Sequence, residues 1–167
     1  MKIILFFVMI ITLSFVEICA TEVSNFKAGL VCFDGKELLG VCHKTEDIYI
    51  TGQGTCIWNQ ENKPCTWYGF SFDYKNAKQG TKILCKYKVS ESITEGNFDG
   101  VRSENTNDGE FLINLENESG HFFNPQYFLF SGYYTSNQNS VIKTETTCAI
   151  DGKQVFSYKI KAHFPIQ

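Results

Sequence analysis

The sequence predicts an all-β fold, an antiparallel β-sandwich held by about three disulfides, with a β-barrel as the alternative. Apolar residues recur with a period of two in most segments, which is the pattern of strands with one buried face. Asp-Gly and Gly-rich turn signals separate these segments, and no segment keeps a helical period. Roughly nine or ten short strands with this punctuation are typical of sandwiches and barrels.

The most regular apolar row lies in residues 66–74, TWYGFSFDY. Its alternate residues Tyr68, Phe70, Phe72 and Tyr74 are all aromatic. Aromatic residues make up 15% of the chain, so several must fill the core, because each of them buries a large apolar area. We therefore assign this row to the core. The alternative is a surface that holds a ligand.

Other segments are interpreted in the same way. Residues 82–89, 110–116 and 153–164 alternate apolar and polar side chains, as half-buried antiparallel strands do. Residues 126–135 are apolar on both faces, which favours a central strand covered on both sides. The polar segment 90–110 is predicted to be a long loop with a short strand near Val101.

Two hairpins are predicted from their turns. Asp151-Gly152 separates two alternating segments, and a two-residue Asp-Gly turn in this setting is a strong hairpin signal. Residues 32–42, CFDGKELLGVC, are interpreted as a second hairpin with a looser turn and a disulfide across it.

Residues 1–20 have the features of a secretory signal peptide. A lysine at position 2 precedes an apolar block, and Ala20 offers a small residue at a cleavage point. The apolar block is shorter than the roughly 20 residues that span a bilayer. We therefore expect a secreted or periplasmic protein, whose residues 21–167 form a single all-β domain without an integral membrane segment.

Six cysteines follow the predicted cleavage point. An even number in an exported chain predicts three disulfides, and sequence alone allows 15 pairings. The favoured pairing is Cys32–Cys42, Cys56–Cys65 and Cys85–Cys148. We expect the last to stabilise most and to join the two sheets. No C-x-x-C spacing or histidine pair accompanies the cysteines, so no metal site is predicted.

Charge and motifs exclude several function classes. The net charge of −3 does not favour nucleic acid as a partner, and the chain has no phosphate-binding loop, so no cofactor is predicted. Lysines at 82, 86 and 88 and at 153, 159 and 161 share strand faces. We interpret them as a solvated face that protects strand edges. A basic stripe for an acidic partner is the alternative.

No catalytic residue is predicted, and we expect that the protein is not an enzyme. Ser71 lies in a strand pattern rather than a nucleophile turn. The histidines at 43, 121 and 163 are far apart in the sequence and lack metal-ligand spacing. A carboxylate-based glycan hydrolase remains a less favoured alternative.

The leading hypothesis is a binding module that recognises a protein or a glycan, with an inhibitor as one form. Its loops (52–65, 90–110, 117–126 and 135–140) would carry recognition. The candidate binding residues are Trp58, Trp67, Asn59 and Asn62, because a tryptophan on a bridged loop is rigidly presented. A carrier of a small apolar ligand is the alternative. Asn117–Ser119 also match the N-glycosylation acceptor pattern of eukaryotic hosts.

Overall fold

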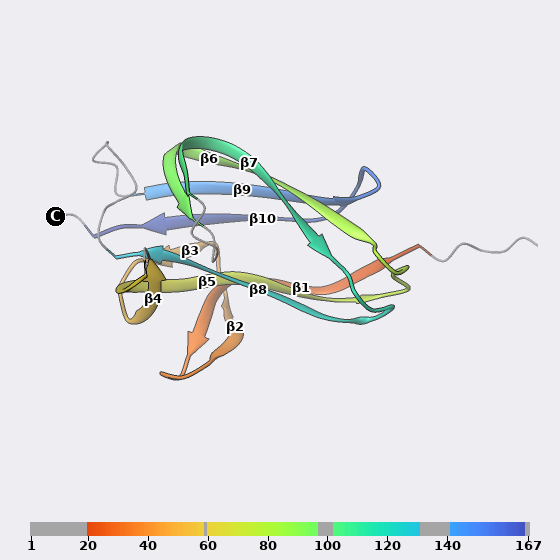
Figure 1. The fold of residues 1–167 in the computed structure, drawn as a ribbon, viewed down its shortest axis with the longest axis horizontal. Helices are drawn as coiled ribbons and strands as arrows, with labels where there is room; N and C mark the ends of the chain where they lie inside the picture. Colours follow the sequence, from red (N-terminus) through yellow and green to blue (C-terminus); the bar gives the residue numbers. More distant parts are fainter. Residues whose placement is uncertain (1–19, 59, 97–101, 131–140, 166–167) are drawn as a thin grey trace, which may run out of the picture.

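The computed structural model describes residues 20–58, 60–96, 102–130 and 141–165, with the backbone alone for residues 92–96 and 102–106. Ten β-strands in these ranges form two five-stranded sheets that pack face to face (Figure 1). This arrangement confirms the predicted β-sandwich over the barrel. The predicted signal peptide, apart from Ala20, lies outside the described residues. Within those residues, no helix is long and apolar enough to cross a membrane.

The strands divide between the sheets according to their pairing. In sheet A the path is β2-β1-β5-β4, with β8 also paired to β5. In sheet B the order is β3-β10-β9-β6-β7. All neighbours are antiparallel except β3 and β10, which are parallel. The strands of sheet A are β1 (Glu22–Phe33), β2 (Leu38–Lys44), β4 (Gly54–Trp58), β5 (Glu61–Lys75) and β8 (Gly120–Leu129). Those of sheet B are β3 (Asp47–Tyr49), β6 (Lys82–Gly96), β7 (Arg102–Asn114), β9 (Val141–Ile150) and β10 (Lys153–His163).

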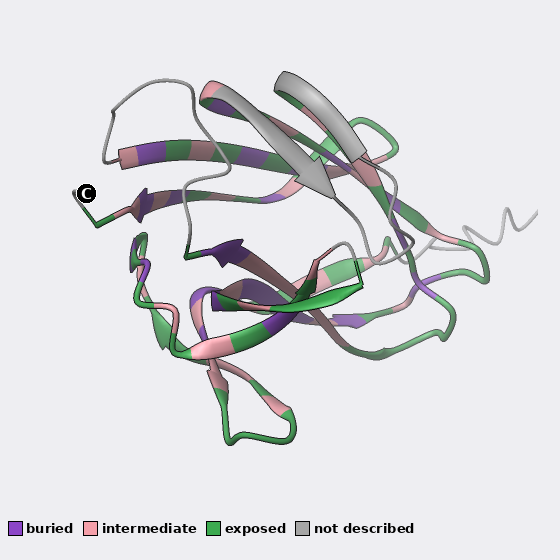
Figure 2. Ribbon diagram, turned by 60° about the vertical axis from the view of Figure 1, so that its left-hand side comes forward, coloured by how far each residue is buried: buried purple, intermediate pink, exposed green. Residues whose placement is uncertain are grey.

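The aromatic row of β5 forms the centre of the core, as predicted. Phe70 and Phe72 are completely buried, and their ring centroids lie 5.8 Å and 5.1 Å from that of Phe156 in the opposite sheet. Tyr74 is also buried, and Tyr68 is half-buried. The rings therefore pack against one another across the sandwich, and Figure 2 shows buried segments in both sheets.

The predicted alternation in β6, β7 and β10 is confirmed, because the apolar set of each strand faces inward. The β9–β10 turn also has the predicted form. Asp151 and Gly152 have φ angles of 49° and 79°, and Ile150 pairs with Lys153. Two consecutive positive φ angles are the signature of a type I′ hairpin turn.

The prediction of a long loop over residues 90–110 is wrong. Strands β6 and β7 continue through most of this segment as a hairpin, in which Ile93 pairs with Thr106 and Gly96 with Arg102. Register shifts interrupt the pairing on both sides of Ile93. Backbone hydrogen bonds form in a polar segment as readily as in an apolar one. The polar side chains of this segment were therefore not evidence for a loop. The strand predicted near Val101 lies outside the described residues.

The prediction of a central strand over residues 126–135 is also wrong. Only residues 126–129 belong to β8, which pairs with β5 alone among the described strands. The end of the strand at Phe128 and Leu129 is covered on both faces although the strand lies at an edge. Phe128 packs into the core between the sheets, and Leu129 packs against Cys56 and Cys65. Burial of Leu129 among the disulfide and the aromatic side chains of Trp58, Trp67 and Tyr127 explains the apolar pattern. Residues 131–135 lie outside the described ranges.

The three disulfides have the favoured pairing, Cys32–Cys42, Cys56–Cys65 and Cys85–Cys148. However, the expectation that Cys85–Cys148 joins the two sheets is wrong. Cys85 in β6 lies directly opposite Cys148 in β9, with 4.0 Å between their Cα atoms. Each disulfide thus lies within one sheet, so side-chain packing rather than a cross-link holds the described sheets together.

Candidate binding surface

The structure brings the two tryptophans together in one cluster. Trp58 at the end of β4 and Trp67 in β5 are half-buried and pack with Tyr127 of β8 around a small apolar centre. The ring centroids of Trp67 and Tyr127 lie 5.2 Å apart at 72°. We call these three aromatic residues the tryptophan cluster. Its centre consists of Cys56, Cys65 and Leu129, each at most 2% exposed.

Local geometry fixes the tryptophan cluster in place. Gly54 lies under the Trp67 indole, and a Cβ atom at position 54 would lie 2.8 Å from Trp67 Cδ1. The Tyr127 hydroxyl donates a 2.9 Å hydrogen bond to the Ile57 carbonyl and so ties β8 to β4. Burial raises the pKa of the Tyr127 phenol. The buried Trp67 Nε1 has no hydrogen-bond partner among the residues that the structure describes. The cluster is therefore rigid and mainly apolar.

The predicted site residues do not form a single patch. Trp58 and Trp67 share the face that carries the Cys56–Cys65 disulfide. Asn62 is exposed and pairs with Ile57, so alternation along the strands places it on the opposite face. Ile57 beside it is 71% exposed. The fourth predicted residue, Asn59, lies outside the described residues.

A second candidate surface is the hairpin of residues 32–42, which we call the arm. The arm extends away from the sandwich (Figures 1 and 2). Strand β1 pairs with β5 only as far as Leu30, and beyond that point it pairs with β2. The departure of β1 from β5 requires Gly29. Its φ is 150°, and a Cβ at this position would lie 2.1 Å from the His43 carbonyl oxygen. Glycine therefore allows β2 to approach closely here.

The arm is a stapled hairpin with an apolar surface. Leu39 is 63% exposed and Phe33 is 37% exposed. The Cys32–Cys42 disulfide joins its two strands. At the turn, the Asp34 carboxylate accepts hydrogen bonds from the backbone N–H groups of Lys36 and Glu37 at 2.8 Å and 2.9 Å. These bonds, that from Glu37 above all, lower the Asp34 pKa.

Sequence reasoning located this hairpin and its disulfide but did not assign it to binding. The available signal was the pair Leu38-Leu39 close to the turn, where polar residues are the norm.

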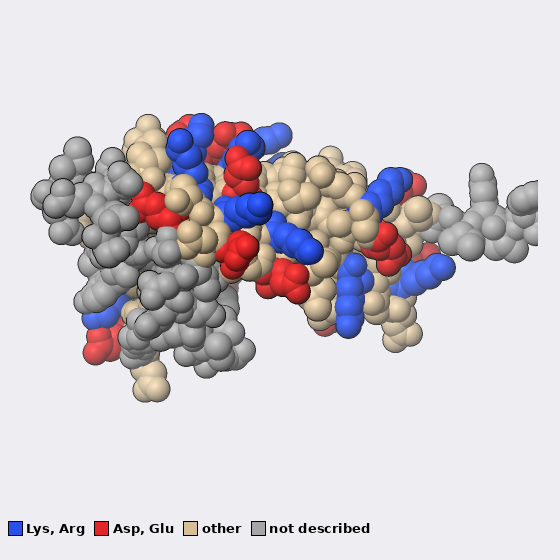
Figure 3. Space-filling model, turned by 90° about the horizontal axis from the view of Figure 1, so that it is seen from above, with Lys and Arg blue, Asp and Glu red and all other residues tan. Residues whose placement is uncertain are grey.

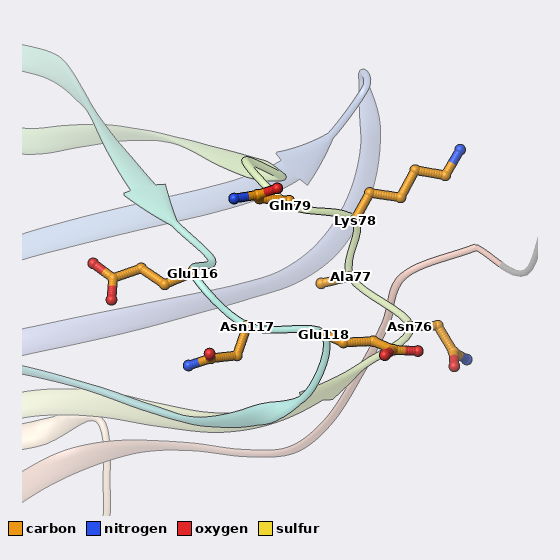
Figure 4. Close-up of a pocket in the computed structure, with 7 residues that line it drawn as sticks. All are labelled: Asn76, Ala77, Lys78, Gln79, Glu116, Asn117 and Glu118. Atoms are coloured by element: carbon orange, nitrogen blue, oxygen red, sulfur yellow. The ribbon is translucent and has the colours of Figure 1, made fainter.

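A hollow of about 550 Å³ lies at the other end of the sandwich, between the β5–β6 and β7–β8 connections (Figure 4). Its lining includes the carboxylates of Glu116 and Glu118, and the less favoured hydrolase alternative would need such a pair. The two side chains point in opposite directions (Figure 4). A glycosidase needs two carboxyl groups that flank the same bond, so this pair does not have the required arrangement.

The outer face of sheet B carries charges of both signs rather than a basic stripe (Figure 3). Strand β9 separates the two lysine-bearing strands, and its Glu145 accepts a 2.8 Å hydrogen bond from Lys159. Lys161 lies 3.5 Å from Glu46. Interleaved charges favour the interpretation as a solvated face.

We predict that the protein loses stability in acid below about pH 4. Several exposed carboxyl groups have lowered pKa values: Asp47 through the hydrogen bond to His163, Asp73 through that to Asn25, and Glu145 through that to Lys159. Since their folded pKa values lie below the ordinary values near 4, the unfolded chain binds more protons as the pH falls. The stabilisation by these carboxylates is complete at a pH above their ordinary pKa values. It is lost as the pH falls through their lower pKa values in the folded state.

Urea denaturation at pH 6 and pH 3 tests this prediction, and a lower midpoint at pH 3 is expected. Asp47→Asn, which cannot titrate, should reduce the difference between the two midpoints. A midpoint that is equal or higher at pH 3 would contradict the linkage.

The histidines are placed apart, and two of them pair with aspartates. His121 Nδ1 and His163 Nε2 each lie 2.7 Å from a carboxylate oxygen, of Asp73 and Asp47 respectively. His43 lies beside the sulfur atoms of the Cys32–Cys42 disulfide. Metal ligation requires a thiolate, and both sulfurs of this group are in the disulfide. Cys32, Cys42 and His43 therefore do not offer a set of metal ligands.

The two packed five-stranded sheets define a β-sandwich. No protein-family model and no curated protein sequence matches the chain. Among solved structures, the chain is similar to an immunoglobulin-like protein from Pseudomonas aeruginosa, with a TM-score of 0.53, 9% identity and coverage of 88% of this chain and 99% of that chain. It also aligns with a DNA-bound alkylpurine DNA glycosylase from Pseudomonas fluorescens (TM-score 0.38, 10% identity), over 86% of this chain and 30% of that chain. The first likeness concerns the fold alone.

Proposed function

We propose that the protein is a secreted or periplasmic binding module that recognises a protein partner through its arm. The observation that carries this proposal is the exposure of Leu39 and Phe33 on a disulfide-linked hairpin that extends from the sandwich. Three disulfides support an oxidising compartment. An immunoglobulin-like sandwich is compatible with this role but does not imply it.

A preorganised hairpin reduces the entropy cost of binding. A two-stranded hairpin alone is marginally stable in water, so an arm without the Cys32–Cys42 disulfide would sample many conformations. The disulfide and the Asp34 turn hold it in one shape before the partner arrives, which lowers the ordering cost of association. A convex apolar hairpin fits a concave apolar site on a protein. An inhibitor that occupies the cleft of a hydrolase is one form of this function.

Recognition of a glycan by the tryptophan cluster is the second candidate. Trp58 and Trp67 both pack against the apolar centre of the tryptophan cluster on a bridged hairpin, and partly exposed aromatic rings provide rigid contact area. Trp58→Ala would then abolish binding to a glycan array while Leu39→Asp would leave it unchanged. Loss of glycan binding in Leu39→Asp but not in Trp58→Ala would place the binding surface on the arm.

A ligand carrier and a glycan hydrolase have less support. A carrier of an apolar ligand would need the β5 row to line a cavity, whereas Phe70 and Phe72 pack directly against neighbouring rings. A hydrolase would need converging carboxylates, whereas Glu116 and Glu118 diverge. The proposed function therefore contains no catalytic step.

We predict that Leu39→Asp weakens partner binding by roughly 30-fold or more, because loss of an apolar anchor at the centre of an interface costs about 2 kcal/mol. A photo-crosslinking residue at position 39 identifies the partner in extracellular fluid, and biosensor titration of the purified partner gives the dissociation constants. The matched control is Leu112→Asp, since Leu112 is 55% exposed on sheet B, far from the arm.

The control should bind as the wild type does, and both variants should keep the wild-type unfolding midpoint. Equal affinity of Leu39→Asp and wild type would remove the arm from the interface. Equal loss in both variants would indicate nonspecific apolar association rather than recognition by the arm.

A further inference from the structure

We infer that Asn117 is an N-glycosylation site, occupied when the chain passes through a eukaryotic secretory pathway. Asn117-Glu118-Ser119 is the acceptor sequence Asn-x-Ser, with a residue other than proline in the middle. No other asparagine in the chain is followed two positions later by serine or threonine without an intervening proline. The inference goes beyond the proposed binding function and does not depend on it.

The fold presents this sequence at the surface. All three residues are exposed, and they lie in the connection between β7 and β8. Buried Leu115 anchors the connection, and its N–H donates a 2.9 Å hydrogen bond to the Thr81 carbonyl. The Ala77 N–H donates a 2.9 Å bond to the carbonyl of Glu118. Backbone contacts thus hold the turn, while a glycan on the exposed Asn117 side chain would disturb no buried group.

The surroundings of Asn117 suit a carbohydrate. The neighbouring hollow of about 550 Å³ is open and is lined mostly by polar side chains that can hydrogen-bond sugar hydroxyls: Asn76, Lys78, Gln79, Glu116 and Glu118 (Figure 4). The first sugars of an N-linked glycan have room beside this turn. The three disulfides support an oxidising compartment such as the endoplasmic reticulum lumen, where N-linked glycans are attached.

Glycosylation here would leave the arm accessible. The β7–β8 connection lies near one end of the long axis of the molecule, and the arm leaves the sandwich toward the other end (Figure 1). A glycan on Asn117 would therefore shield the hollow and its surroundings. It would not cover the exposed apolar residues Phe33 and Leu39.

The test is expression of the full chain, with its predicted signal peptide, for secretion from insect cells. Intact mass of the secreted protein is measured before and after treatment with peptide N-glycosidase, and peptide mapping locates the modified residue. We expect a mass in excess of the polypeptide, which the enzyme removes to leave aspartate at position 117. A secreted wild-type protein with the mass of the bare polypeptide would overturn the inference.

Matched variants make the result specific. Asn117→Gln and Ser119→Ala should lose the added mass, while Ser119→Thr, which keeps an acceptor sequence, should retain it. Asn114→Gln alters an exposed asparagine outside the acceptor sequence and should also retain it. Reductive methylation of Lys78 should be at least twofold slower in the glycosylated protein if the sugars cover the hollow. An equal rate would overturn that part of the inference.

Discussion

Replacing Phe70 by alanine is expected to lower the free energy of unfolding by about 3–5 kcal/mol, which is the cost of truncating a buried phenylalanine. Phe70 has no exposed surface. Its ring contacts Phe122 of the same sheet, and Phe156 and Tyr158 of the opposite sheet, at centroid distances of 6.1, 5.8 and 5.2 Å. Truncation leaves a cavity at the point where the two sheets meet. Because no disulfide joins the described parts of the sheets, this packing is their main attachment.

Urea denaturation followed by fluorescence and circular dichroism measures this effect. Phe70→Leu, which keeps most of the apolar volume, should lose less than Phe70→Ala. Leu112→Ala removes an exposed apolar side chain and should change stability by no more than about 0.5 kcal/mol. A loss below about 1 kcal/mol in Phe70→Ala would contradict a packed core and would support a cavity lined by the aromatic row.

The sequence predicted the parts of the fold that depend on neighbouring residues. Tyr68, Phe70, Phe72 and Tyr74 share a face because a strand repeats every two residues, and this holds whichever strands lie beside β5. The turn at Asp151 was predictable for a similar reason, since Asp-Gly accepts the two positive φ angles of a tight hairpin.

Features that depend on distant strands could not be predicted. The position of Cys85 opposite Cys148 within one sheet follows from the order β9-β6. Alternation fixes which face a side chain occupies but not which strand is its neighbour. The departure of the arm depends on the close approach of Gly29 to His43, which joins residues on two strands. The same reason explains why the arm was not recognised as a binding surface.

The candidate site was partly predictable. Trp58 and Trp67 each lie two positions from a cysteine of the predicted Cys56–Cys65 disulfide, so both reach the apolar centre around it, although residues 52–65 were interpreted as a loop. The contribution of Tyr127 required knowledge that β8 lies beside β5. Asn62 was grouped with the tryptophans as part of one loop, but β4 and β5 are paired strands, and strand alternation places it on the other face.

Removing the Cys85–Cys148 disulfide is expected to lower the free energy of unfolding by about 4 kcal/mol. The two residues are 63 positions apart, and a cross-link that closes a loop of this length removes much of the freedom of the unfolded chain. The variant Cys85→Ala/Cys148→Ala should therefore show a much lower midpoint in urea. A loss of this size is a large share of the roughly 5–15 kcal/mol that typically separates folded and unfolded states.

Cys32→Ala/Cys42→Ala is the matched comparison, because its disulfide spans 10 positions and joins the two strands of the arm. The arm can open without unfolding the sandwich, so the midpoint of global unfolding should change less than in Cys85→Ala/Cys148→Ala. Both cysteines of the longer link are fully buried, and their replacement also leaves a small cavity. A variant that keeps only Cys85 and Cys148, measured oxidised and reduced, removes this ambiguity, since reduction breaks the link and retains the sulfur atoms. A difference below about 1 kcal/mol between these two forms would show that packing around the sulfurs, rather than the cross-link, stabilises sheet B.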